Sequence, residues 1–240
     1  MNSTKVFLDI NIGDQEQYKK QVEEYERGKK FVNKVGNSYG LGTNVNALDE
    51  TGKETILQLY QTDPSSKDGN ILLEEPNSLH AGRIVIELLT KDSPKACENF
   101  KALCTGELKN KSSNPAKYEL YYKNCVIHRV QKDFMFQGGD FTRGDGSGGE
   151  SIWNKKFNDD KGGLKLKHDA AGVVSMANSG KNSNTSQFFI TFGPQPKLDG
   201  KYVVFGKVVE GKEVLDKINR TGTENGQPTQ NISIKDCGSL

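Results

Sequence analysis

The sequence predicts a mainly β fold, an antiparallel barrel with two helices, into which a partly helical segment is inserted near the N-terminus. Two observations support this class. Short β patterns separated by glycine-rich turns fill the chain after Val126, and an early strand pattern at Val6–Ile12 is followed by helical spacing instead of a partner strand. Many short strands at close spacing favour an antiparallel barrel over a parallel α/β sheet.

The first elements surround the insertion. Val6–Ile12 alternates apolar and polar residues, as a half-buried strand does, and a turn follows. Gln15–Val35 then has the spacing of an amphipathic helix, and Glu54–Tyr60 predicts a short second helix. We therefore predict a single domain over residues 1–240, with residues 14–80 inserted as a helical and loop segment into the first hairpin.

The β pattern resumes at Arg83–Leu89. Ser93 is placed to cap, and Pro94 to begin, a helix that ends near Gly106. A further helix is predicted at Glu213–Asn219. The remaining predicted strands are Val126–Val130, Phe134–Gln137, Gly172–Met176, Phe188–Thr191, Val203–Lys207 and Ile232–Asp236.

The inserted segment allows two interpretations. It has twelve acidic and eight basic residues, a net charge of −4, whereas the whole chain has +2. In the first interpretation its helix folds back on the barrel and buries an apolar stripe. In the second it is a docking surface for a partner protein. The stripe consists of Tyr18, Val22, Tyr25 and Val32.

Composition excludes several classes of function. The 240 residues include 33 basic and 31 acidic side chains, so no global field selects nucleic acid or an anionic membrane. No secretory signal and no membrane-spanning apolar stretch is visible, which predicts a cytoplasmic or nuclear protein. The four cysteines lack the spacing of a metal site or disulfide scaffold, which predicts free thiols.

The stretch His128–Phe141 is the most unusual in the sequence. It combines the strong cation Arg129 with large apolar side chains and the amide of Gln137. Ser175–Gly180 and Ser186–Thr191 add further amides next to apolar residues. Such a mixture is typical of an apolar ligand pocket with a few fixed polar groups.

These stretches closely resemble the cyclophilin family, over Lys5–Gly13 and Ala81–Leu240. The resemblance implies a closed eight-stranded antiparallel barrel capped by two helices, a monomer, and peptidyl-prolyl cis/trans isomerase activity on proline-containing segments without a cofactor or metal. The motifs that carry it include Ile127-His-Arg-Val, Phe134-Met-Phe-Gln-Gly-Gly-Asp-Phe, Gly146-Ser-Gly-Gly, Ser175-Met-Ala-Asn-Ser-Gly, Ser186-Gln-Phe-Phe-Ile, Leu198-Asp-Gly-Lys, Val203-Val-Phe-Gly-Lys-Val and Asp236-Cys-Gly.

The same resemblance implies the site. Arg129 would donate to the prolyl nitrogen as the amide twists, on an apolar surface for the proline ring, and amides would hold the peptide backbone and Arg129 in place. The implied catalytic residues are Arg129, Phe134, Gln137 and Asn178. The implied substrate-binding residues are Met135, Gly146, Ala177, Gln187, Phe189, Lys197, Leu198 and Tyr202. His128 is expected to be buried and hydrogen-bonded, since a rotation needs no proton transfer.

Two positions depart from the family pattern. Lys197 stands where many members have Trp, and Tyr202 where many have His. An indole contributes a rim surface and a hydrogen-bond donor, and lysine replaces only a charge-bearing reach, so we expect weakened binding of cyclosporin-type macrocycles. The insertion and these two residues also motivate an alternative function, a proline-peptide-binding scaffold module that the insertion recruits to a complex.

Overall fold

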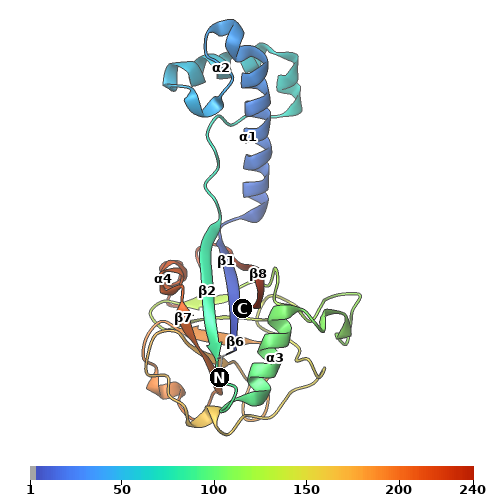
Figure 1. The fold of residues 1–240 in the computed structure, drawn as a ribbon, viewed down its shortest axis with the longest axis vertical. Helices are drawn as coiled ribbons and strands as arrows, with labels where there is room; N and C mark the ends of the chain where they lie inside the picture. The colour runs from blue at the N-terminus through green and yellow to red at the C-terminus, as the bar shows by residue number, and fades with distance from the viewer. Residues whose placement is uncertain (1–3) are drawn as a thin grey trace. The chain divides into compact units, whose positions relative to one another are not determined.

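The computed structural model describes residues 4–240 (Figure 1). The chain divides into two compact units. One is Gly13–Leu79, and the other combines the residues up to Ile12 with His80–Leu240. The inserted segment therefore begins and ends one residue earlier than predicted, because His80 already pairs with Asn11 in the first hairpin.

The larger unit is built on one eight-stranded antiparallel sheet, which confirms the predicted fold class. Its strands are β1 (Lys5–Ile12), β2 (His80–Leu88), β3 (Arg129–Gln131), β4 (Met135–Gly138), β5 (Val173–Met176), β6 (Phe188–Thr191), β7 (Val204–Glu210) and β8 (Ile232–Ser239). Their order across the sheet is β3-β4-β6-β5-β7-β2-β1-β8.

The sequence predicted a closed barrel, but the barrel in the structure is not fully closed. Its two edge strands, β3 and β8, meet only through the residues that precede β3. There Val126 forms an isolated antiparallel bridge with Ser233, and the Ile127 amide donates to the Ile232 carbonyl. The predicted strand Val126–Val130 accordingly shrinks to Arg129–Gln131, because this crossing replaces a continuous ladder with single contacts.

Two helices pack on the sheet (Figure 1). Helix α3 (Pro94–Thr105) packs against β8, β1 and β7, and α4 (Lys212–Arg220) against β2, β3 and β4. Ser93 occupies the predicted N-cap position of α3, but its side chain accepts no amide of the first turn. Its hydroxyl donates instead to the Val204 carbonyl at 2.6 Å and so ties the start of the helix to β7.

Aromatic rings fill the core of this unit. Phe100 of α3 is fully buried and contacts the rings of Tyr122, Phe188 and Phe205 at centroid distances of 4.9 to 5.2 Å. Short 3₁₀ turns connect the elements at Lys109–Lys111, Gly163–Lys165 and Pro196–Leu198. All four cysteines are buried as free thiols, and burial raises the pKa of Cys97 to about 12.

The smaller unit contains two helices and three 3₁₀ turns. Helix α1 (Gln15–Val35) begins at Asp14, whose carboxylate accepts the amides of Glu16 and Gln17. Helix α2 spans Glu50–Thr62, longer than the predicted Glu54–Tyr60 because Asp49 caps it at the Gly52 amide. The 3₁₀ turns are η1 (Gly36–Tyr39), η2 (Val45–Ala47) and η3 (Pro64–Asp68).

This unit has its own hydrophobic core, which corrects the expectation that its helix buries its stripe on the barrel. Tyr25 and Val32 are buried as predicted, but their apolar neighbours all belong to this segment, and Tyr18 and Val22 are only half-buried. The buried members are Tyr25, Phe31, Val32, Val45, Leu48, Ile56, Tyr60, Ile71 and Leu73. The rings of Phe31 and Tyr60 meet edge to face at 5.0 Å.

The segment that returns to the barrel lies along α1. The Leu72 amide donates to the Glu24 carbonyl at 3.0 Å, and Arg27 donates to the Asn70 carbonyl. This close approach depends on Gly28, since a Cβ there would lie 2.1 Å from the Leu72 carbonyl oxygen.

None of the helices in residues 4–240 is long and apolar enough to cross a membrane.

Candidate active site

A tight hairpin presents Arg129. Strands β3 and β4 pair with Arg129 opposite Gln137 and Val130 opposite Phe136. The turn between them places Asp133 at φ 58°, a left-handed conformation that Asp tolerates. Because side chains alternate along a strand, Val130 and Phe136 enter the core with no exposed area, and Arg129 and Gln137 share the other face.

The register of the next strands extends this face. Gln137 of β4 pairs with Phe189 of β6, and Phe189 pairs with Ser175 of β5. Arg129, Gln137 and Phe189 therefore stand in one row across the sheet. The row brings a cation, an amide and a buried ring together from segments that are distant in sequence.

A cavity of about 270 Å³ lies over this row. Its apolar lining is supplied by six side chains and its polar lining by a guanidinium and two amides, as expected for a small apolar group held next to fixed donors. The nine lining residues are Arg129, Phe134, Met135, Gln137, Ala177, Asn178, Phe189, Leu198 and Tyr202.

Phe189 is held in place from two sides. The Tyr202 ring meets it edge to face at 5.3 Å, and the His168 ring stacks on it at 5.8 Å. His168 is fully buried and is hydrogen-bonded through Nδ1 to Asp199 and through Nε2 to Ser175. His168 thus fixes the apolar surface of the cavity.

A second cavity of about 310 Å³ adjoins the first. The two share Gln137, Ala177 and Asn178, and two further predicted site residues, Gly146 and Gln187, line the second one. Gln187 links the linings of the two cavities. Its oxygen accepts from Gln137 at 2.8 Å, and its amide group donates to the carbonyls of Gly146 and Gly148.

The loop around the second cavity is organised by Asp140, which sequence reasoning did not assign a role. Its buried carboxylate accepts the amides of Arg143, Gly146 and Gly148. Burial acts to raise the pKa of Asp140, but these hydrogen bonds outweigh it and hold the pKa below the ordinary value. An aspartate just before a glycine-rich loop was the signal available in the sequence.

Comparison with known proteins agrees with this geometry. The model of the cyclophilin type peptidyl-prolyl cis-trans isomerase family matches residues 74–239. The chain belongs to the cyclophilin family. Peptidyl-prolyl cis-trans isomerase 9 of Caenorhabditis elegans is 49% identical over 160 residues, which cover 66% of this chain and 50% of that protein. The chain thus spans about half the length of this curated relative.

The structure brings eleven of the twelve predicted site residues of this cyclophilin to the two cavities. Nine of the twelve line the first cavity, and Gly146 and Gln187 the second. Lys197 lines neither, but its ammonium lies 4.5 Å from the centroid of the Phe134 ring. The contact expected between an amide and Arg129 is made by Gln131, two residues along β3, and not by Gln137.

Gly226 also positions Arg129 and was missed in the sequence. It has φ 86°, and a Cβ there would lie 2.9 Å from the Cγ and 3.0 Å from the Nε of Arg129. The carbonyl of Gly226 accepts the Val130 amide, so the backbone of this loop is bonded to β3 next to the arginine. No local pattern in the sequence relates residue 226 to residue 129.

We predict that Gly226→Ala lowers turnover because the added methyl group displaces the stem of Arg129. Steady-state kinetics on an Ala-Pro peptide should show roughly a tenfold loss in kcat/KM, equivalent to about 1.4 kcal/mol. Gly40→Ala is the control, since Gly40 has a similar φ of 71° but open space around it. Equal turnover of both variants and the wild type would contradict the role of Gly226.

The hydrogen bond expected for the Nδ1 atom of His128 is absent among residues 4–240. Nδ1 is buried, although the histidine as a whole is half-buried. Burial lowers its pKa, so the ring is neutral at pH 7. Its ring limits the loop opposite, because a Cβ on Gly146 would lie 2.6 Å from Nε2. In the described part of the chain no cluster of three or more His, Cys, Asp or Glu side chains could hold a metal.

Two histidines, the buried His168 and the half-buried His128, predict a loss of stability in mild acid. Burial lowers the pKa of His168 and His128 in the folded protein, whereas an unfolded histidine titrates near about 6.5. The unfolded state therefore binds protons first, and the free energy of unfolding falls as the pH drops below about 6.5. Urea denaturation at pH 7.5 and 5.5, followed by Trp153 fluorescence, measures this fall. His168→Gln should reduce the pH dependence; an unchanged wild-type stability would contradict the prediction.

Proposed function

We propose that this protein is a peptidyl-prolyl cis/trans isomerase that accelerates rotation about X-Pro bonds in protein substrates. The observation that carries the proposal is Arg129 in the lining of the 270 Å³ cavity, next to the apolar side chains Phe134, Met135 and Phe189. Its guanidinium is exposed and donates to Gln131, and it forms no ion pair among residues 4–240. A donor is therefore available to a ligand in the cavity.

The chemistry needs no covalent step. Resonance gives the peptide C–N bond partial double-bond character and a rotation barrier of about 18 to 20 kcal/mol. When the amide twists, the nitrogen lone pair is no longer delocalised and can accept a hydrogen bond. A donor that meets this lone pair interacts with the transition state and not with the planar ground state, so it raises turnover. Arg129 provides such a donor, and the fixed charge of arginine keeps it a donor at any physiological pH.

The apolar surface of the cavity supports the same reaction. Phe134, Met135 and Phe189 would hold the proline ring, and burial of the ring removes water from the twisting bond. The twisted amide has less charge separation than the planar one, so an apolar environment costs it less. Gln137 and Asn178 lie where the two cavities meet and would bind the backbone of the preceding residues.

Refolding of a protein whose slow phase is an X-Pro isomerisation tests the proposal. Uncatalysed, such a phase takes roughly 10 to 100 s at 25 °C. A catalytic amount of this protein should shorten it in proportion to its concentration. A slow phase that does not change, with peptide binding still detectable, would favour the alternative, a module that binds proline-containing segments without turning them over.

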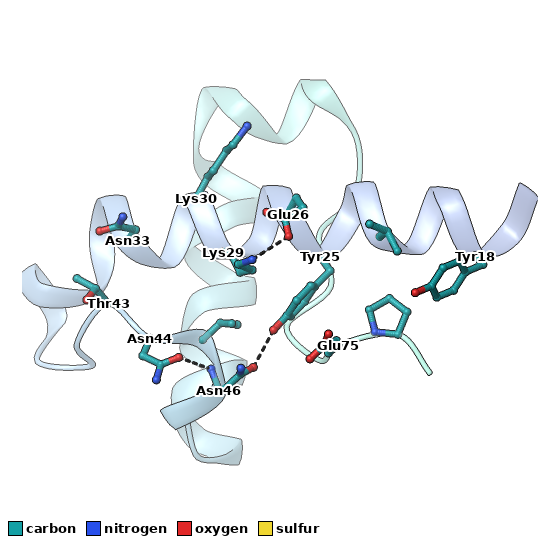
Figure 2. Close-up of a pocket in the computed structure, with 13 residues that line it drawn as sticks. Tyr18, Tyr25, Glu26, Lys29, Lys30, Asn33, Thr43, Asn44, Asn46 and Glu75 are labelled. Atoms are coloured by element: carbon teal, nitrogen blue, oxygen red, sulfur yellow. Dashed lines mark hydrogen bonds and ion pairs between the residues drawn. The ribbon is translucent and has the colours of Figure 1, made fainter. Parts of the chain in front are cut away.

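We further propose that residues 13–79 dock an extended peptide segment of a partner protein. A groove of about 530 Å³ runs along α1 in this unit (Figure 2). The lining residues Tyr18 and Asn33 are fifteen positions apart on the helix, about 22 Å, which matches some six or seven extended residues.

The lining of the groove suits a peptide. Its apolar lining includes Val22, Val45 and Pro76 together with the ring of Tyr25. The Tyr25 hydroxyl donates to Asn46 at 2.8 Å (Figure 2). The lining also contains amides that can pair with a peptide backbone and charges of both signs; they are Asn33, Asn44, Asn46, Glu26, Glu75, Lys29 and Lys30. Selection from a displayed peptide library followed by NMR mapping tests the proposal. Shifts confined to the barrel, or no selected peptide, would overturn it.

The rim residue Lys197 predicts weak inhibition by cyclosporin-type macrocycles. An indole at this position would offer a flat apolar surface with a donor at its edge, whereas lysine offers a flexible ammonium donor without that surface. We expect the inhibition constant of the wild type to exceed that of Lys197→Trp by at least about tenfold, equivalent to about 1.4 kcal/mol. Nanomolar inhibition of the wild type would contradict this prediction.

A further inference from the structure

Lys197 places a second cation at the rim of the proline-sized cavity. It lies in the 3₁₀ turn Pro196–Leu198, directly before the lining residue Leu198. Its ammonium lies 4.5 Å from the centroid of the half-buried Phe134 ring, so the π face of that ring holds the charge next to the cavity. The side chain is exposed and remains accessible to a ligand.

No carboxylate neutralises this cation. Among residues 4–240, neither Lys197 nor Arg129 forms an ion pair. The carboxylate near Lys197 in sequence is Asp199, and the one near Arg129 is Asp133. Both of them bind other side chains. Asp199 accepts from His168 and Lys167, and Asp133 accepts from Asn219. The cavity is therefore bordered by two cations that have no partner of opposite charge.

We propose that this site prefers substrates in which an aspartate or glutamate is adjacent to the proline. The inference rests on the proposed isomerase function and specifies its substrate class. Complementary charge at the rim attracts the acidic segment and strengthens its binding without entering the apolar cavity. A tryptophan at this position would offer a surface that contacts any apolar side chain. Lysine offers instead a charge that distinguishes acidic from neutral residues next to the proline.

The geometry indicates which side of the proline is read. The second cavity joins the first through Gln137, Ala177 and Asn178, so one half of a bound peptide passes over those residues. Lys197 contacts Phe134 and is adjacent in sequence to Leu198, and both of these residues line only the first cavity. The acidic side chain accordingly belongs to the half of the peptide that leaves the proline cavity away from the second one.

The expected effect is modest and depends on salt. An exposed ion pair contributes up to about 1 kcal/mol, which corresponds to a preference of roughly threefold to fivefold. Ions screen such a pair over about 8 to 10 Å at 0.1 to 0.15 M ionic strength, so the preference should shrink as salt is added. Apolar contacts with the proline ring do not share this dependence.

Matched peptides test the preference. Peptides of the form Ala-Ala-Pro-Ala carry Glu or its neutral isostere Gln immediately before or immediately after the proline, and kcat/KM is measured for each by NMR exchange. The wild type should favour Glu over Gln roughly threefold at the position after the proline, and not at the position before it. Lys197→Gln should bring the ratio to about 1, and Lys197→Glu should invert it. Lys235→Gln, which removes an exposed lysine on β8, should leave the ratio unchanged.

The outcomes separate this inference from the isomerase proposal. A wild-type ratio of one at the position after the proline, or a preference that survives in Lys197→Gln, overturns the inference even when all peptides are turned over. Absence of turnover on every peptide overturns the isomerase function instead. In that case the ratio of dissociation constants for the Glu and Gln peptides, from chemical-shift titration, still decides the preference.

Discussion

Arg129→Ala should abolish most of the isomerase activity, with a loss in kcat/KM of about 100-fold or more. The reason is that the guanidinium is the one charged donor in the lining of the 270 Å³ cavity, and removal of one donor to a transition state typically costs about 100- to 1,000-fold. Because this interaction forms only when the amide twists, the affinity for a ground-state peptide should change little. Steady-state kinetics and a peptide titration measure the two quantities.

The controls separate a lost donor from a damaged hairpin. Lys132→Ala removes an exposed cation from the adjacent turn and should leave turnover unchanged. Arg129→Lys keeps the charge but not the planar fork of donors and should recover little of the loss. Full activity in Arg129→Ala would mean that another group carries the reaction; a loss of peptide affinity equal to the loss of turnover would assign Arg129 to binding.

Ile56→Ala should unfold the inserted unit without stopping the barrel. Ile56 has no exposed area and lies in the core formed by residues of the segment 13–79. Truncation of such a side chain costs about 2 to 5 kcal/mol, which is comparable to the whole stability of a unit of this size. The barrel core contains none of these residues, so isomerase turnover should persist.

Neighbouring residues provide the control and the readout. Leu57 is adjacent on α2 but 42% exposed, so Leu57→Ala should have little effect. Far-UV circular dichroism follows the helices of the inserted unit, whereas the single tryptophan, Trp153, packs on the barrel core and reports that unit. Simultaneous loss of both signals in Ile56→Ala would show that the two units share one folding transition.

Several elements of the fold were predictable because their signals are local. Helix α1 begins and ends where the sequence predicted, since Asp14 caps its first turn and Gly36 follows its last residue. Strand β6 also has the predicted bounds, with the apolar residues of a buried strand. The apolar cavity was predicted through the family resemblance, and nine of the proposed site residues line it.

The errors arose where long-range contacts decide. The contact of Gly226 with Arg129 spans 97 positions, and the hydrogen bonds of His168 to Ser175 and Asp199 depend on how loops fold together. Gln131 was in reach of sequence reasoning, since period-2 spacing places it on the same side of β3 as Arg129. The separate core of residues 13–79 was missed because a helical stripe shows that a face is buried but not what buries it.

Two-dimensional NMR exchange on a short Ala-Pro peptide tests the central claim most directly. The peptide exchanges too slowly on its own to give cross-peaks between its cis and trans signals. A catalytic amount of the wild-type protein should produce these cross-peaks, and Arg129→Ala should not. If the wild type binds the peptide but produces no exchange, the assignment of an isomerase to this cavity is wrong.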